Sequence, residues 1–146
     1  MIKDVFLAAA LIVSGTVCAE AQTAAGLWKT FGDHSGEAES LVRIIERNGE
    51  FEGRVEVVFS PPSPIADPRC DLCPGELKDK PVVGLRILTG LRRDGDAYSG
   101  GEILDPDDGK IYKCALRLTN GGRKLEVRGY IGIPLFGRTQ SWLRQD

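Results

Sequence analysis

The sequence predicts an all-β protein: a single antiparallel up-and-down barrel of about eight strands, with one long loop rich in proline and cysteine. Apolar and polar residues alternate with a period of two over most of the chain, as in strands with one buried face. Eighteen glycines in 146 residues favour tight turns over long helices. Short turns join neighbouring segments, so a closed meander is simpler than a two-sheet Greek key.

The first 21 residues differ in composition from the rest. Lys3 precedes the nine-residue apolar run Val5–Val13, and Ala19-Glu20-Ala21 fits a small-x-small cleavage site. The pattern predicts a signal peptide at 1–21, because the run is far shorter than the ~20 residues that a membrane span needs. We therefore expect an exported protein, periplasmic or secreted, whose mature part, 22–146, is one barrel domain without a membrane span.

The charge of the chain excludes some partners. The formal net charge is −2, with 19 basic and 21 acidic residues. This balance gives no electrostatic reason to expect nucleic acid or an anionic membrane surface as a partner. The length is enough for one domain and too short for two. The oligomeric state is not indicated by the sequence.

The first three predicted strands, 26–31, 40–46 and 51–59, are separated by turn residues. The segment 32–36 (GDHSG) has turn chemistry, and its His34 is interpreted as an exposed turn residue. Asn48-Gly49 is a strong hairpin signal between the second and third strands. In the third strand every second residue is apolar or glycine, which predicts one buried face: Phe51, Gly53, Val55, Val57 and Phe59.

Five further strands follow the long loop. The first is predicted to bury Val83, Leu85, Ile87 and Leu91 on one face together with Thr89, and the third to bury Tyr112, Cys114, Leu116 and Leu118. Asp105, Asp107 and Asp108 lie between strands and are interpreted as a solvated turn. The predicted strands are 83–91, 97–104, 111–119, 125–131 and 138–144.

The two ends of the domain indicate closure of the barrel. Gly26-x-Trp28 resembles the Gly-x-Trp motif of lipocalin-like barrels, in which an arginine of the last strand packs over the tryptophan. Arg144 is the matching residue and Arg138 the second candidate; the physical basis is cation–π stacking plus donors that reach the chain ends. Lipocalins also have a helix near the C-terminus, which this sequence lacks, so the expectation concerns barrel topology.

Five stretches carry a resemblance to a known family: GLWKT from Gly26, SLVRI from Ser40, KDKPVVGLRIL from Lys78, GGEILDPDDGKIYKC from Gly100 and RGYIGIPLFGRTQSWLR from Arg128. With them, nearly all of residues 26–144 resembles a bacterial family of small exported proteins, domain of unknown function 2147. The resemblance implies a fold similar to lipocalin-type barrels and an exported protein, and it brings no established activity.

Three cysteines remain after the predicted cleavage. Either Cys70 and Cys73 form a local disulfide and Cys114 is a buried thiol, or one loop cysteine bridges to Cys114. We favour the longer bridge slightly, because closing about forty residues stabilises by up to ~4 kcal/mol in the chain-entropy model. Thiol exchange and a zinc site completed by His34 or an aspartate are weaker alternatives, since nearby carboxylates oppose thiolate formation and a second CxxC is absent.

The last two strands carry the candidate ligand-binding residues Tyr130, Arg138, Gln140 and Trp142. On the inner face of the barrel they would line a pocket for an anionic or amphipathic ligand; on the outer face they would be a solvated coat. Leu125, Val127 and Ile131 look like the core side, which favours the solvated coat for Arg128 on the same strand. Trp142 shares the parity of Gln140 and favours the inner face for the last strand, so the sequence leaves the two alternatives open.

We expect a binding protein that holds a small apolar or amphipathic ligand in the barrel mouth, with the loop at 60–81 as the lid. The alternative is an envelope structural or protein-interaction module with a solid core. A thiol- or metal-dependent enzyme is a third, weaker alternative. The sequence shows no placed nucleophile–base pair, phosphate loop or complete metal motif, so we expect neither catalysis nor a cofactor.

Overall fold

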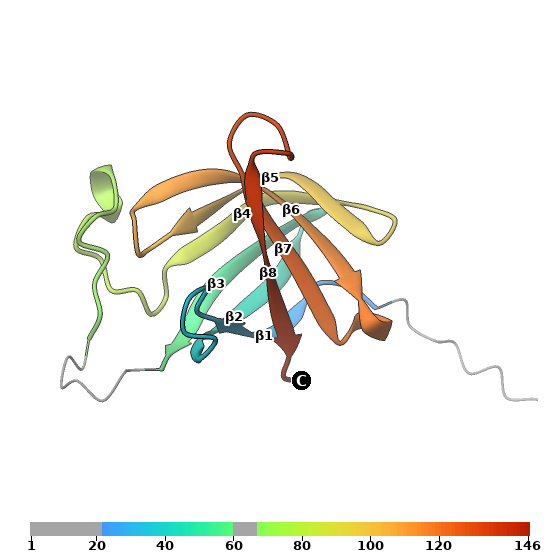
Figure 1. The fold of residues 1–146 in the computed structure, drawn as a ribbon, viewed down its shortest axis with the longest axis horizontal. Coiled ribbons are helices and arrows are strands. Elements are labelled where there is room, and N and C mark those ends of the chain that lie inside the picture. The colour runs from blue at the N-terminus through green and yellow to red at the C-terminus, as the bar shows by residue number, and fades with distance from the viewer. Residues whose placement is uncertain (1–21, 60–66) are drawn as a thin grey trace, which may run out of the picture.

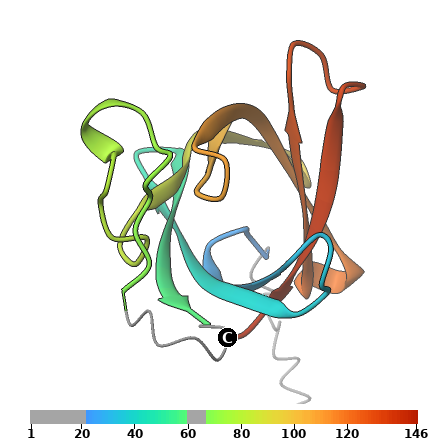
Figure 2. The ribbon, with the colours of Figure 1, turned by 60° about the vertical axis from the view of Figure 1, so that its left-hand side comes forward.

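The computed structural model describes residues 22–59 and 67–146, which form a closed barrel of eight antiparallel strands (Figures 1 and 2). Each strand pairs with the next in sequence, and the last pairs with the first, which confirms the predicted meander. The predicted signal peptide lies outside the described residues. The strands are β1 (Gly26–Phe31), β2 (Ala38–Arg47), β3 (Glu50–Val58), β4 (Arg86–Asp94), β5 (Ala97–Asp105), β6 (Lys110–Thr119), β7 (Lys124–Tyr130) and β8 (Gly137–Arg144).

The core lies inside the barrel, where all eight strands contribute side chains. Phe51 and Tyr98 pack edge to face there, with ring centroids 4.8 Å apart. None of the helices in the described ranges is long and apolar enough to cross a membrane. The largest fully buried side chains are Trp28, Trp142, Tyr98, Phe51, Ile44, Leu88, Leu91, Leu116, Leu125 and Val42, with Cys70 and Cys114.

A β-bulge in β3 changes which residues face the core. The register between β2 and β3 shifts between Leu41 and Val42, where β3 carries one extra residue. Beyond this point the alternation reverses, so that Val58 packs against the core while Val57 and Phe59 are each 38% exposed. The predicted buried face is therefore correct as far as Val55 and wrong beyond it.

A similar shift occurs between β3 and β4, on both sides of Gly53. Leu88 is fully buried, whereas Thr89 pairs with Glu102 on the opposite face. The predicted burial of Val83 and Thr89 on one core face is wrong: irregular pairing breaks the period of two before Thr89, and Val83 lies in the turn before β4, where it is 46% exposed. Gly53 itself has no room for a side chain, because a Cβ would lie 3.0 Å from Leu88 Cδ1.

The described part of the long loop folds into a small hairpin beside the barrel (Figure 2). The Cys70 amide donates to the Lys80 carbonyl (2.9 Å), and the Val82 amide donates to the Pro68 carbonyl (2.9 Å). A short 3₁₀ turn, η1 (Gly75–Leu77), lies at the tip. The loop contacts the β5–β6 turn, where a Cβ on Gly109 would collide with the Leu72 carbonyl oxygen. The hairpin is thus fixed to the barrel wall.

The seam between β1 and β8 is the shortest in the barrel. Its pairing consists of Trp28 with Arg144 and Lys29 with Leu143. The Gln145 amide extends it by donating to the Leu27 carbonyl at 2.8 Å. The second 3₁₀ turn, η2 (Asn120–Gly122), lies next to this end of the barrel and contributes a carbonyl to its closure.

Candidate functional site

The closed end of the barrel is organised around Trp28 and Arg144. The Arg144 guanidinium carbon lies 4.4 Å from the centroid of the Trp28 ring, in cation–π geometry. The same guanidinium donates to the carbonyls of Thr23 (2.6 Å), Ala25 (2.9 Å) and Gly122 (2.8 Å). The predicted relation among Gly26, Trp28 and Arg144 is therefore present, and it ties the two chain ends together.

Gly26 is required at this end for two reasons. Its φ of +144° is unfavourable for residues with a side chain, and a Cβ there would overlap the Arg144 guanidinium. The Trp28 indole donates to the Ala24 carbonyl at 2.8 Å, and the Ala24 amide donates to the Tyr98 hydroxyl at 2.9 Å. These contacts satisfy the buried polar groups, so the closed end has a structural role.

The four predicted ligand residues do not form one patch. In the β7–β8 register, Gln140 pairs with Val127 and Arg138 with Gly129, on the face that holds the core residue Trp142. Tyr130 pairs with Gly137, one step out of phase, and so lies on the outer face. The structure brings three of the four residues together and separates Tyr130 from them.

A chain of hydrogen bonds joins these three inner-face residues to the β1–β2 turn. The Trp142 indole donates to Gln140 Oε1 (3.1 Å), and Gln140 Nε2 donates to Asp33 Oδ1 (2.8 Å). Arg138 then bridges Asp33 Oδ2 (2.8 Å) and Asp105 Oδ2 (2.7 Å). The guanidinium is already engaged by two carboxylates, which makes it a poor anchor for an anionic ligand.

Sequence reasoning missed the acidic character of this barrel mouth. Desolvation, followed by repulsion from Asp107, Asp33 and Asp105, raises the pKa of Glu39. Desolvation and the carboxylates of Asp105 and Asp108 likewise raise the pKa of Asp107. The β5–β6 turn, interpreted from the sequence as a solvated turn, is also part of this acidic mouth, because the β1–β2 turn and β2 bring Asp33 and Glu39 to the same end. Within the described ranges, no group of three or more His, Cys, Asp or Glu side chains is arranged to hold a metal ion.

The cysteines follow the local alternative. Cys70 and Cys73 form a disulfide, with Cα atoms 5.3 Å apart, and Cys114 is a buried free thiol. The preference for a bridge to Cys114 is wrong because the barrel wall separates the partners: Cys114 faces the core from β6, while Cys70 lies against Pro106 in the β5–β6 turn. Burial raises the pKa of Cys114 to about 12, so the thiol is unreactive at neutral pH.

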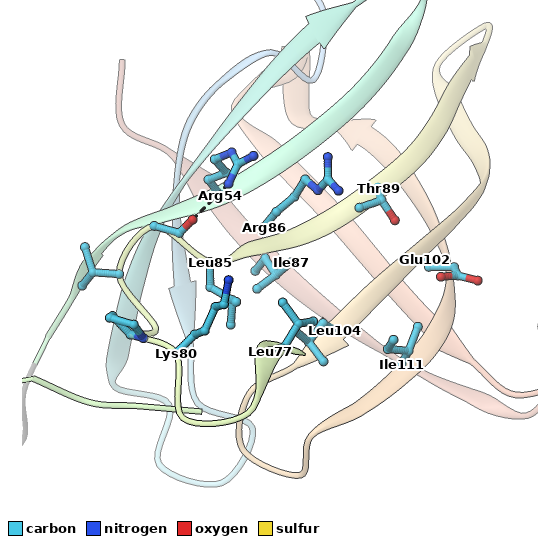
Figure 3. Close-up of a pocket in the computed structure, with 13 residues that line it drawn as sticks. Arg54, Leu77, Lys80, Leu85, Arg86, Ile87, Thr89, Glu102, Leu104 and Ile111 are labelled. Atoms are coloured by element: carbon cyan, nitrogen blue, oxygen red, sulfur yellow. Dashed lines mark hydrogen bonds between the residues drawn. The ribbon is translucent and has the colours of Figure 1, made fainter. Parts of the chain in front are cut away.

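A groove of about 510 Å³ lies between the long loop and the outer wall of the barrel (Figure 3). The strand register places this groove on the outer face of the barrel. The pair Leu88–Ile103 points inward. The pairs Thr89–Glu102 and Leu104–Ile111 lie one residue away from it, and therefore point outward. Leu104 is nevertheless only 5% exposed, and Leu77 of the loop lies beside it. The lining residues are Arg54, Leu77, Lys80, Pro81, Val83, Gly84, Leu85, Arg86, Ile87, Thr89, Glu102, Leu104 and Ile111.

A second opening, of about 410 Å³, lies at the β1–β8 seam. It is lined by residues of β1 and β8, including Asp33 next to β1 and the predicted ligand residue Gln140. Its polar lining residues include Thr139, Ser141 and Lys124, and its apolar surface is smaller than that of the groove under the loop.

Comparison with known proteins gives two matches. The family described as "Uncharacterized protein conserved in bacteria (DUF2147)" matches residues 26–144. A structure from Helicobacter pylori, titled as a protein of the lipocalin family, is similar with a TM-score of 0.73 and 22% sequence identity, and the match covers 86% of this chain and 85% of the other. No curated protein matches the chain.

Proposed function

Since the chain belongs to the DUF2147 family and folds as a lipocalin-like barrel, we propose that it binds a small apolar or amphipathic molecule. The observation that carries the proposal is the groove between the long loop and the wall formed by β4, β5 and β6 (Figure 3). Its volume of about 510 Å³ lies within the range of ligand pockets, roughly 300–1,000 Å³. The loop at 67–82 would cover this site from outside the barrel, whereas the sequence led us to expect the loop at 60–81 as a lid over the barrel mouth.

The composition of the groove supports an amphipathic ligand. Leu77, Leu85, Ile87 and Leu104 provide an apolar floor, and Ile111 is 50% exposed at one end. Charged and polar side chains stand around this floor. A surface of this kind holds an apolar body by burial and orients it through a few polar contacts.

The barrel mouth supports the proposal less well than the groove does. Arg138 is occupied by Asp33 and Asp105, and Trp142 is buried at 2% exposure with its indole hydrogen bonded to Gln140. These side chains are already satisfied by one another. We therefore place the ligand under the loop and regard the inner-face residues of β8 as a polar cluster that orders the mouth.

A second candidate function is an envelope structural or protein-interaction module. It is favoured by the β7–β8 loop, which projects from the barrel (Figure 1). Ile131, Ile133, Leu135 and Phe136 in this loop are 67%, 53%, 76% and 67% exposed. A cluster of large exposed apolar side chains is typical of an interaction surface.

We also propose that the protein is exported and cleaved after Ala21. The signal-peptide pattern of residues 1–21 supports this, and the Cys70–Cys73 disulfide is consistent with an oxidising compartment. Expression of the chain from its own start, followed by mass spectrometry of the periplasmic fraction, tests the proposal. A mature N-terminus at Gln22 is expected; an intact Met1 in the cytoplasm would contradict it.

Ligand binding is tested by isothermal titration calorimetry of the mature protein with dodecanol and dodecanoate. Ile111→Asp places a charge on the apolar floor and is expected to weaken binding of both by about tenfold, the equivalent of about 1.4 kcal/mol of lost apolar contact. Ile45→Asp is the matched control, because Ile45 is an exposed strand isoleucine outside the groove lining. The proposal fails if neither probe binds the unchanged protein, or if both variants bind equally weakly.

A further inference from the structure

Three arginines lie in one row across the outer wall of the barrel. Arg43 of β2 pairs with Arg54 of β3, and Arg54 pairs with Arg86 of β4. All three lie on the outer face, because the neighbouring pairs Ile44–Gly53 and Gly53–Leu88 face the core. Like charges directly opposite each other on adjacent strands destabilise a sheet, so this row needs an explanation.

The arginines at the two ends of the row, Arg43 and Arg86, have acidic partners. Arg43 forms ion pairs with Glu56 (2.8 Å) and Asp146 (3.6 Å). Arg86 forms one with Glu52 at 3.4 Å. Each pair offsets part of the repulsion from Arg54.

The central arginine is different. Within 22–59 and 67–146, no carboxylate lies within ion-pair distance of Arg54. Its guanidinium donates to one carbonyl, that of Gly84, at 3.2 Å, and Arg54 is part of the groove lining. Arg54 is thus a cation between two cations, with unused hydrogen-bonding capacity.

The loop adds a third positive charge to the groove. Lys80 projects from the loop toward the side on which Arg54 and Arg86 lie, while Glu102 lies at the other end, near Ile111 (Figure 3). The groove lining therefore has three cations and one anion, although the chain as a whole has a net charge of −2. The positive end and the apolar floor are adjacent, which is the complement of a molecule with an anionic head and an apolar body.

We propose that the groove binds an amphipathic anion, whose carboxylate or phosphate head is held by Arg54 with Arg86 and Lys80 beside it. The apolar body lies along Leu85, Ile87 and Leu104 toward Ile111. The head relieves the repulsion within the arginine row and accepts the free guanidinium donors. This inference rests on the proposed ligand-binding function and adds the sign of the charge and the residues that recognise it.

The experiment uses four single-chain probes of equal length: dodecanoate, dodecyl phosphate, dodecanol and dodecyltrimethylammonium. Isothermal titration calorimetry gives the affinity of each for the mature protein and for Arg54→Gln, Arg86→Gln and Arg92→Gln. Arg92→Gln is the matched control. Arg92 is an exposed arginine of β4, the strand that also holds Arg86, and it pairs with Glu50 outside the groove lining. Thermal melts verify that each variant is folded.

The two anions are expected to bind about tenfold or more tightly than dodecanol, as befits charge-assisted hydrogen bonds. Arg54→Gln removes most of this difference and Arg86→Gln part of it, while dodecanol binding changes less than about twofold. Added salt weakens the anions and leaves dodecanol unchanged, because exposed charges are screened. Dodecanoate and dodecyl phosphate together show whether one head group is preferred.

Other outcomes overturn the inference. If dodecanol binds as tightly as dodecanoate, the groove binds apolar chains without reading their charge, and the proposed function stands alone. If Arg92→Gln weakens anion binding as much as Arg54→Gln, the effect is one of overall charge. Tightest binding of dodecyltrimethylammonium would point to the acidic mouth. If no probe binds, both the inference and the proposed function fail.

Discussion

Arg144 lies over the ring of Trp28 with its guanidinium carbon 4.4 Å from the ring centroid, and these two residues join the last strand to the first. Besides the cation–π contact, the guanidinium supplies donors to three backbone carbonyls near the chain ends and at η2. Removal of this one side chain takes away the stacking and leaves partly buried carbonyls without donors.

We therefore expect Arg144→Ala to lower the free energy of unfolding by about 3 kcal/mol, the sum of a cation–π contact and two or three hydrogen bonds. Urea denaturation followed by circular dichroism measures the change. Arg117→Ala is the control, because Arg117 is exposed on β6 and should change stability by less than about 0.5 kcal/mol. Equal stability of the two variants would mean that Arg144 does not hold the barrel closed.

The contact between Gly109 and Leu72 predicts a local effect on the loop. Gly109→Ala adds a Cβ that collides with the Leu72 carbonyl and also strains a residue at φ +70°. Gly95→Ala is the matched control: its φ is +64°, and a Cβ there meets nothing within 4 Å. Both variants carry the backbone strain, of order 1 kcal/mol, and Gly109→Ala alone has the collision.

Hydrogen exchange of residues 69–82 distinguishes the two glycine variants. We expect the amides of Cys70 and Val82 to exchange faster in Gly109→Ala, because the loop hairpin detaches from the β5–β6 turn. In Gly95→Ala their exchange should match the unchanged protein. Identical exchange in both variants would show that the Gly109–Leu72 contact does not fix the loop.

Cys114 predicts how stability depends on pH in the alkaline range. Burial raises its pKa from an ordinary value of 9.0 to about 12, so the thiol stays protonated in the folded state while the unfolded thiol ionises. Between these two values the unfolded state binds fewer protons, and stability falls as pH rises. The slope approaches about 1.4 kcal/mol per pH unit for a single group.

Denaturant titrations at pH 8 and pH 10 test this expectation, with Cys114→Ala as the comparison. The variant keeps an apolar side chain and has no thiol to ionise, so its stability should fall less over this interval. A parallel fall in both proteins would assign the pH dependence to other groups. In the folded protein at pH 8, iodoacetamide should leave Cys114 unmodified, and unfolding should expose it.

The acidic mouth predicts a pH dependence of the same sign as that of Cys114, but in the acidic range. The pKa of Glu39 is raised above its ordinary 4.5, first by desolvation and then by Asp107, Asp33 and Asp105. A raised carboxyl pKa means that stability present below 4.5 is lost as pH rises through the folded-state value. Glu39→Gln should therefore stabilise the protein at pH 7, by less than about 1 kcal/mol because Glu39 is exposed and solvent screens the repulsion, and should have little effect at pH 3.

Denaturation of Glu39→Gln at pH 7 and pH 3 measures this difference. Glu37→Gln is the control, because Glu37 is an exposed glutamate of the turn that precedes β2. Destabilisation by Glu39→Gln at pH 7 would contradict the expected repulsion among the mouth carboxylates.

Strand number and topology could be predicted because alternation and turn residues are local properties. The register shifts in β3 and β4 could not, since one extra residue in β3 reverses the side of Val57 and Phe59 and the alternation of residue types does not reveal it. The faces of Tyr130 and Arg138 depend on how many residues the β7–β8 turn uses, and the sequence does not fix that number. The same holds for the cysteines, whose separation across the barrel wall is a property of the folded chain.

The alignment of the three arginines could likewise not be predicted from the sequence. The sequence indicates that Arg54 points away from the core, because it lies between Gly53 and Val55. The alignment of Arg54 with Arg43 and Arg86 follows from pairing across two strand boundaries, one of them interrupted by the long loop. A groove formed by segments distant in sequence therefore became visible only with the fold.

The narrow seam between β1 and β8 has a consequence for the order of events during synthesis. Arg144 donates to the carbonyl of Thr23, 121 residues earlier, and β1 has no other partner on that side. Until β8 has left the ribosome, the nascent chain holds seven strands with two unpaired edges. Closure of the barrel therefore waits for the strand that is made last, and until then both open edges are available for edge-to-edge association.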